Sequence, residues 1–270
     1  DPNIPFCVFK VTGIAPLGTL EKLSNRKKLD AKGQSKCSRI RGRIGEICEA
    51  AHAANQPVFI DAEESWIQDA IDRMADEMMS RFNRTRPIIH NTIQMYRTDR
   101  LQFLRESRKR AKDGGYILAV KIVRGAYMEK ERGLALEKGY RSPIQPDKES
   151  TDTDYNLAID YCLRHLDMVS FVAGTHNEES TQLLVQKMRE AGIKSNDPHI
   201  CFSQLYGMSD NLSYVLAENG YNVSKYVPYG PIADTIPYLI RRAEENTSVA
   251  GQMSRELEMI SSELERRRLA

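Results

Sequence analysis

Short apolar segments alternate along the chain with longer segments whose apolar residues recur at helical spacing. Residues 6–15 (FCVFKVTGIA) and 57–65 (PVFIDAEES) are rich in β-branched and aromatic residues, which favours strands. Residues 116–127 (YILAVKIVRGAY) are almost continuously apolar, a pattern typical of a parallel strand buried on both faces. A helix after residue 65 is predicted by apolar residues three or four positions apart, namely Ile67, Ile71, Met74, Met78 and Phe82.

The alternation continues to the end of the chain. Further helices are predicted at about residues 40–56, 97–115, 153–166, 178–192 and 209–219, with apolar segments between them. Repeated about eight times, this order predicts an α/β fold of the (βα)8 barrel type. An open doubly wound sheet is the alternative, but no G-x-G-x-x-G sequence supports a dinucleotide site of that fold. We interpret residues 1–270 as one domain, and the polar residues 21–39 as a loop or a shortened insertion.

Composition narrows the possible partners. The 39 basic and 37 acidic residues give a net charge of +2, which provides no reason to expect nucleic acid as a partner. The five cysteines are odd in number and contain no C-x-x-C pair, so they favour a reducing compartment and neither a disulfide framework nor a zinc ribbon. We expect no metal site and no membrane-spanning helix.

Polar residues follow most of the predicted strands. Because the active sites of barrels lie at the carboxyl ends of the strands, we expect these side chains to converge on one mouth. They are Lys10, Thr12, Asp61, Gln94, Lys121, Arg124, Tyr127, Thr175, His176, Asn177, Gln204, Tyr206, Tyr226 and Tyr229.

Two adjacent arginines stand in the predicted helix that contains residues 238–246 (YLIRRAEEN). Tyr238, Arg241, Arg242 and Glu245 lie three or four positions apart and share one broad face of that helix. Neighbouring guanidinium groups can close on one small carboxylate from two sides, and Glu245 can orient one of them. The alternative is a helix face exposed to solvent, in which Arg241 and Glu245, four positions apart, form an ion pair. It would show the same spacing.

Seven segments together resemble proline dehydrogenase in their order and spacing, from about residue 6 to residue 250. They are FIDAEES, NTIQMY, VKIVRGAYMEKER, THN, FSQLYGM, KYVPYGP and YLIRRAEEN. VRGAY and KYVPYGP are more similar to the mitochondrial type than to the bifunctional bacterial enzymes. The resemblance implies a distorted (βα)8 TIM-type barrel that holds FAD, with the final helix laid over the barrel mouth.

The resemblance also implies how the substrate, L-proline, is bound. Arg241, Arg242 and Lys10 are expected to bind its carboxylate, and Leu205, Tyr226 and Tyr238 to pack against its ring. Asp61 is expected to hold Tyr226 by a hydrogen bond, although a residue directly after a strand can also cap the following helix. The expected catalytic set is therefore Lys10, Asp61, Tyr226, Arg241 and Arg242.

For FAD, the resemblance places Lys121 near flavin N5 and Gln94 at the pyrimidine edge. It assigns phosphate and backbone contacts to Arg124 and Gly125, and contacts with the pyrophosphate and adenosine to Thr175, His176 and Asn177. The rest of the expected cofactor site comprises Ala126, Tyr127, Gln204, Leu205 and Glu245.

The implied reaction is oxidation of L-proline to Δ1-pyrroline-5-carboxylate by hydride transfer to FAD, which a quinone reoxidises. Hydroxyproline dehydrogenase is the related alternative, but that branch carries a small residue at the position of Tyr226. Two other classes are a barrel lyase with Lys121 as a Schiff-base nucleophile and a non-catalytic barrel.

The implied location is the matrix side of the mitochondrial inner membrane, or the bacterial cytoplasm next to the membrane. The amphipathic residues 254–270 are a candidate for peripheral membrane contact, and packing against the barrel or a partner is the alternative.

Overall fold

A computed structural model describes residues 3–233, 235–236, 238–240 and 261–268 of the chain. The chain divides into two compact units. The first comprises Asp1–Gln204 and Asn211–Ser224, and the second comprises Leu205–Asp210 and Lys225–Ala270. The interpretation of residues 1–270 as one domain stays a prediction.

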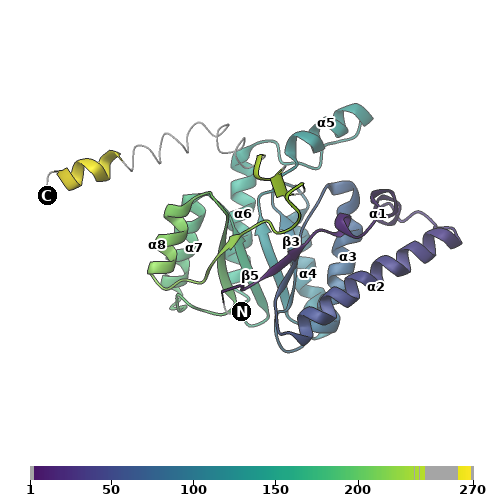
Figure 1. The fold of residues 1–270 in the computed structure, drawn as a ribbon, viewed down its shortest axis with the longest axis horizontal. Coiled ribbons are helices and arrows are strands. Elements are labelled where there is room, and N and C mark those ends of the chain that lie inside the picture. The colour runs from purple at the N-terminus through teal and green to yellow at the C-terminus, as the bar shows by residue number, and fades with distance from the viewer. Residues whose placement is uncertain (1–2, 234, 237, 241–260, 269–270) are drawn as a thin grey trace. The chain divides into compact units, whose positions relative to one another are not determined.

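The strands form one seven-stranded sheet in which spatial order follows chain order (Figure 1). They are β1 (Cys7–Phe9), β2 (Val58–Ile60), β3 (Ile89–Gln94), β4 (Leu118–Val123), β5 (Val169–Gly174), β6 (Ile200–Leu205) and β7 (Val223–Tyr226). Successive strands from β1 to β6 pair in parallel. Parallel neighbours in unbroken chain order are the topology of the predicted α/β barrel type. The expected placement of the final helix over the mouth stays a prediction, because that segment lies largely outside the described residues.

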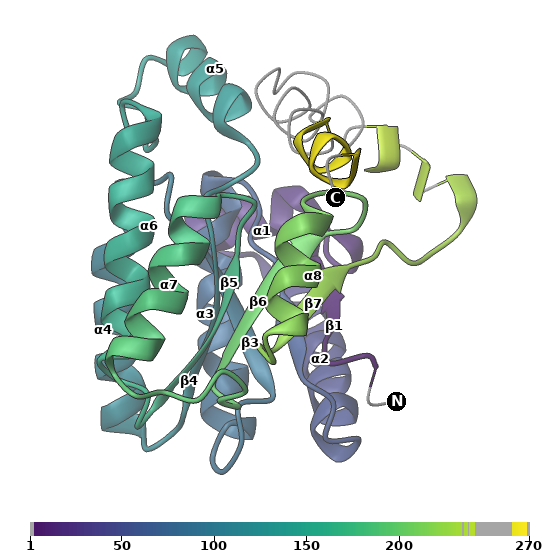
Figure 2. The same ribbon diagram turned by 90° about the vertical axis from the view of Figure 1, so that its left-hand side faces the viewer.

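Helices connect successive strands. They are α1 (Leu17–Ser24), α2 (Ala31–Ala53), α3 (Ser65–Phe82), α4 (Arg100–Gly114), α5 (Met128–Lys138), α6 (Lys148–Leu163), α7 (Glu178–Glu190) and α8 (Asp210–Glu218), with a short 3-10 helix at Val11–Gly13. Figure 2 shows α4, α6 and α7 side by side along the outer side of the sheet. Among the described residues, no helix has both the length and the apolar character needed to cross a membrane.

The sheet of the first unit has two differently packed faces. Asn91 of β3 donates to Asp72 of α3, at 3.0 Å, so this side of the strand faces the helices. Since side chains alternate along a strand, His90, Thr92 and Gln94 point to the opposite, inner side. There the His90 ring packs edge-on against Phe59, with 5.3 Å between ring centroids. Burial, with a smaller contribution from Lys121, lowers the pKa of His90 to about 4, so this histidine is a neutral packing residue.

Two helices show how local sequence sets their limits. Ile67, Ile71, Met74 and Met78 of α3 are all buried, which confirms the predicted apolar face. Helix α4 ends where Gly115 adopts a φ of +66°, a left-handed conformation that glycine enters without a steric penalty. The predicted end of this helix near residue 115 is therefore confirmed.

The interpretation of residues 21–39 as a loop is wrong. Residues 21–24 complete α1, and residues 31–39 form the first turns of α2. Asp30 caps α2 by accepting a hydrogen bond from the Gly33 N–H at 2.7 Å. The first buried residue of α2 is Ile40. This part of the helix therefore faces solvent and shows none of the apolar periodicity from which a helix is predicted.

Candidate active site

Three charged residues meet at the carboxyl ends of the first strands. Lys10 follows β1 directly, Asp61 follows β2, and Lys121 lies in β4. The Lys121 ammonium donates to Asp61 Oδ1, and Lys10 Nζ lies 3.6 Å from Asp61 Oδ2. Asp61 and Lys121 are 7% and 6% exposed, whereas the Lys10 side chain is 43% exposed. The Asp61 carboxylate thus lies between a buried cation and a cation that reaches solvent.

Lys10 is held in its charged form. Burial by itself would lower the pKa of Lys10, but the Asp61 carboxylate, with smaller contributions from Tyr127 and Glu63, raises it above its ordinary value. Lys10 Nζ also donates to the Tyr127 hydroxyl, at 3.4 Å. An exposed ammonium that keeps its charge is suited to bind a carboxylate.

Asp61 does not cap the following helix. The N-cap position of α3 is occupied by Glu64, whose own side chain makes no capping hydrogen bond. Asp61 instead takes part in the ion pairs with the two lysines. The hydrogen bond expected between Asp61 and Tyr226 stays a prediction.

Two polar groups next to this cluster have no hydrogen-bond partner among the described residues. They are Gln94 Oε1 and Thr92 Oγ1, on side chains that are 3% and 4% exposed. Thr92 lies opposite Lys121 in the register of β3 and β4. Buried polar atoms normally find a partner, so an amide oxygen in this position fits a ligand that presents a hydrogen-bond donor.

Arg124 joins the exits of β4 and β5. Its guanidinium donates to Asp152 at 2.6 Å, Thr175 Oγ1 at 2.6 Å and Ser180 Oγ at 2.9 Å. It also stacks on the Tyr155 ring, 4.3 Å from the centroid. Arg124 and Thr175 are therefore brought together as expected, and their contacts with a cofactor phosphate stay a prediction.

The backbone after Arg124 is closely packed. Gly125 has a φ of +138°, and a Cβ at this position would lie 2.5 Å from the Tyr96 ring. Only glycine fits this conformation and contact. Next to it, Ala126 is exposed and Tyr127 is half-buried.

The T-H-N segment, residues 175–177, directly precedes α7. Asn177 caps this helix by accepting from the Ser180 N–H at 2.8 Å, while His176 is half-buried. Gln204 donates to the Thr175 carbonyl at 3.2 Å and accepts from Ser213 Oγ at 2.9 Å. Asn177 and Gln204 thus have structural roles besides the cofactor contacts predicted for them.

In the second unit, two of the predicted ring-packing residues meet. The Tyr226 and Tyr238 rings are stacked, with 6.2 Å between centroids and an interplanar angle of 23°. Leu205 belongs to the same unit. Arg241, Arg242 and Glu245 lie outside the described residues, so their predicted roles stay predictions.

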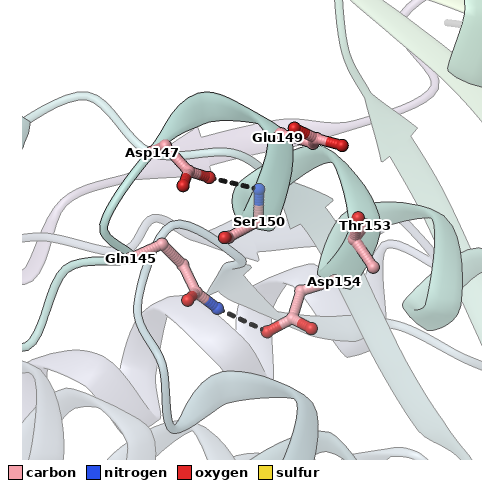
Figure 3. A pocket seen from close by; sticks show the side chains of 6 residues that line it. All are labelled: Gln145, Asp147, Glu149, Ser150, Thr153 and Asp154. Atoms are coloured by element: carbon pink, nitrogen blue, oxygen red, sulfur yellow. Dashed lines mark hydrogen bonds between the residues drawn. The ribbon is translucent and has the colours of Figure 1, made fainter.

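A separate pocket of about 370 Å³ lies at the start of α6 (Figure 3). Its lining comprises Gln145, Asp147, Glu149, Ser150, Thr153 and Asp154. Gln145 donates to Asp154 at 2.6 Å, and the Ser150 N–H donates to Asp147 at 2.7 Å. The pocket contains none of the predicted site residues. Its acidic side chains make it unsuited to an anionic substrate. Across the described ranges, no group of three or more His, Cys, Asp or Glu side chains is placed to bind a metal ion.

Sequence reasoning missed several residues that connect the strand ends. Glu63 accepts from Thr12, and Glu131 accepts from Ser65. The available signal was the segment DAEES, in which three carboxylates and a serine follow one strand within five residues.

Known proteins resemble this chain over most of its length. A family model described as proline dehydrogenase matches residues 8–255. The carbapenem antibiotics biosynthesis protein CarD of Pectobacterium carotovorum is 36% identical over 265 residues, covering 98% of this chain and 68% of CarD. The mitochondrial proline dehydrogenase 1 of Arabidopsis thaliana is 38% identical over 252 residues, covering 92% of this chain and 50% of the relative. The relatives named mitochondrial and this bacterial relative are about equally identical to the chain. These identities therefore favour neither the mitochondrion nor the bacterial cytoplasm as its location.

Two further comparisons concern substrate and fold. The hydroxyproline dehydrogenase of Xenopus laevis is 38% identical over 232 residues, covering 83% of this chain and 49% of that protein. The chain thus spans about half the length of the two dehydrogenases named. A crystal structure of proline utilization A from Bdellovibrio bacteriovorus matches with a TM-score of 0.79 at 20% identity, covering 90% of this chain and 24% of that chain. This match supports the TIM-barrel-like fold.

Proposed function

Because this chain belongs to the proline dehydrogenase family, we propose that it oxidises L-proline to Δ1-pyrroline-5-carboxylate with FAD as cofactor and a quinone as electron acceptor. The observation that carries the proposal is the cluster of Lys10, Asp61 and Lys121 at the strand ends. It presents a charged ammonium where a barrel enzyme binds its substrate.

The residues at the strand ends fit a flavin. The buried Gln94 Oε1 has no partner among the described residues and is suited to accept from the N–H of a pyrimidine ring. Lys121, opposite Thr92 in the register of β3 and β4, provides a buried positive charge, which favours added negative charge on a reduced ring. The rest of the cofactor would be held by the residues at the exits of β4, β5 and β6. They are Arg124, the backbone at Gly125 and Ala126, Tyr127, the T-H-N segment and Gln204. When bound, FAD supplies the acceptor for a hydride from a C–H bond next to nitrogen.

The substrate would be bound by its two ends. Lys10, with Arg241 and Arg242, would bind the carboxylate by charge-assisted hydrogen bonds, which fix orientation as well as affinity. Leu205, Tyr226 and Tyr238 would pack against the ring and exclude water. The ring nitrogen must be unprotonated to release a hydride from its neighbouring carbon, and this proton is lost to solvent or to a basic group before the reaction.

The geometry of Lys121 disfavours a Schiff-base lyase. Its amine nitrogen is held in a buried ion pair with Asp61, whereas a Schiff-base lysine has to present this nitrogen to a carbonyl group. In a flavin-dependent reaction, Lys121 would contribute only its positive charge near the flavin. An ion pair with Asp61 is compatible with that role.

The proposed function is tested by the absorption spectrum of the purified protein before and after anaerobic addition of L-proline. We expect the bands of oxidised flavin, and we expect proline to bleach them. Cyclopentanecarboxylate, which has the ring and carboxylate of proline but no nitrogen, is the control that should leave the bands in place. A bound flavin that proline does not bleach contradicts the proposal.

Tyr226 is expected to set the preference for proline over hydroxyproline. Its ring is stacked on Tyr238. In the proposed site this ring would fill space that a hydroxyl group on the substrate ring needs. Replacing Tyr226 with serine should raise the ratio of kcat/KM for hydroxyproline to that for proline about tenfold or more, since one contact of this kind is worth about 1–3 kcal/mol. Tyr214→Ser, on the exposed side of α8, is the matched control and should leave the ratio unchanged. An unchanged ratio in Tyr226→Ser would show that this residue does not select the substrate.

A further inference from the structure

The segment Asp61–Ala62–Glu63–Glu64–Ser65, which we call the DAEES segment, connects several neighbouring strand exits. Asp61 pairs with Lys121 of β4, and Glu64 pairs with Lys130 of α5. Two more contacts, made by Glu63 and Ser65, each involve both oxygens of a buried glutamate.

The first contact holds the exit of β1. Glu63, 3% exposed, accepts from the Thr12 N–H at 3.0 Å with one oxygen and from the Thr12 hydroxyl with the other. The Glu63 N–H in turn donates to Gln68 Oε1 at 2.7 Å. Thr12 comes two residues after Lys10, so this contact fixes the backbone from which the Lys10 side chain extends.

The second contact holds the start of α5. Glu131 is fully buried, and its two oxygens accept from the Ser65 N–H and the Ser65 hydroxyl, each at 2.6 Å. Ser65 is the first residue of α3, and a carboxylate is favoured at the positive end of a helix. The Glu131 N–H donates to the Tyr127 carbonyl at 2.9 Å in the first turn of α5. This contact therefore fixes the backbone of Tyr127.

Lys10 is two residues from Thr12 of the first contact, and Tyr127 is four residues from Glu131 of the second. The lysine ammonium lies 3.4 Å from the tyrosine hydroxyl. Burying a carboxylate is costly unless it is fully hydrogen-bonded, and both glutamates meet this condition through a single partner residue. Each contact joins residues more than fifty positions apart in sequence. They are thus placed to fix the relative position of the two strand exits.

We propose that Glu63 and Glu131 are positioning residues that hold Lys10 and Tyr127 in register at the binding site for the substrate carboxylate. The inference rests on the proposed function, since it assigns the carboxylate of proline to Lys10. A contact made equally with substrate and transition state changes KM and leaves kcat unaltered, so the two glutamates should act on KM.

Two variants test this directly in the flavin-loaded protein. Thr12→Val and Ser65→Ala each remove one hydroxyl group and keep the backbone N–H that bonds the same glutamate. We expect each to raise KM for proline about tenfold while kcat changes less than about twofold. The Kd for cyclopentanecarboxylate, measured by titration calorimetry, should rise by the same factor. In the double variant, KM should rise by less than the product of the two single effects, because both act on one pair of residues.

Conservative replacements provide the controls. Thr12→Ser and Ser65→Thr keep a hydroxyl group, so each variant should have the same KM for proline as the wild-type protein. Lys130→Met removes the other ion pair of the same segment, in which Lys130 is 61% exposed and Glu64 12% exposed, and leaves Thr12 and Ser65 in place, so it should leave KM unchanged. Unchanged KM in Thr12→Val and Ser65→Ala would overturn the inference, as would a loss of kcat together with thermal stability. Failure of the wild-type protein to oxidise proline would instead refute the proposed function.

Discussion

Replacing Asp72 with alanine is expected to lower the free energy of unfolding by about 3–5 kcal/mol, the cost of breaking a buried ion pair by removing one partner. Asp72 lies in α3 and pairs with Arg100 of α4 at 2.7 Å, and both side chains are 5% exposed. The same carboxylate accepts from Gln68 at 2.9 Å and from Asn91 at 3.0 Å. Its removal leaves three buried donors without this acceptor.

The charge of Arg100 persists in that variant. Burial opposes the charge, but hydrogen bonds and ion pairs with Asp99 and Asp72 raise the pKa of Arg100 above its already high ordinary value. Asp99 remains after the substitution and is expected to limit the loss. Chemical denaturation of Asp72→Ala and of the wild-type protein measures the difference.

Asp113→Ala is the matched control for Asp72→Ala. Asp113 pairs with Lys109 at 2.7 Å, but their side chains are 61% and 77% exposed, so its loss should cost less than about 1 kcal/mol. Equal losses in the two variants would show that burial does not decide the energy of these pairs.

The meeting of Lys10, Asp61 and Lys121 at the strand ends could be predicted because the topology of the sheet fixes where these residues lie. In a parallel sheet whose strands follow chain order, residues directly after each strand share one edge. This rule alone places Lys10, Asp61 and Gln94 together once the strands are recognised. The apolar run of β4 is similarly unambiguous, and it carries Lys121.

Buried polar contacts could not be predicted in the same way. Glu131 occurs in the sequence MEKERG, where a charged residue is expected in solvent, yet it is fully buried against Ser65. Its partner is 66 positions away, and no local pattern records the pairing. Helix α5 was missed for a related reason, because only Glu131 and Ala135 of its residues are buried and no apolar stripe results.

Asp61→Asn is expected to cause the largest loss of activity among the described residues, about 100-fold in kcat/KM for proline, equivalent to about 2.7 kcal/mol. Asparagine has nearly the same shape as aspartate but leaves Lys10 and Lys121 without the negative charge between them. The Asp61 carboxylate is also the main group that raises the pKa of Lys10. Without it, Lys10 loses its proton at lower pH, and a neutral amine no longer pairs with a carboxylate.

The sign of this effect is visible in the pH dependence of KM. In the wild-type protein, the raised pKa keeps Lys10 charged well into the alkaline range, so titration of Lys10 should add no rise in KM there beyond the effect of the substrate's own nitrogen. In Asp61→Asn, the rise of KM should begin at lower pH, which steady-state kinetics between about pH 7 and about pH 10 would measure. Asp76→Asn is the control, because Asp76 bonds Tyr116 and Arg110 outside the cluster and should leave the profile unchanged. If Asp61→Asn lost activity without this shift, the carboxylate would act on the reaction by a route other than the charge of Lys10.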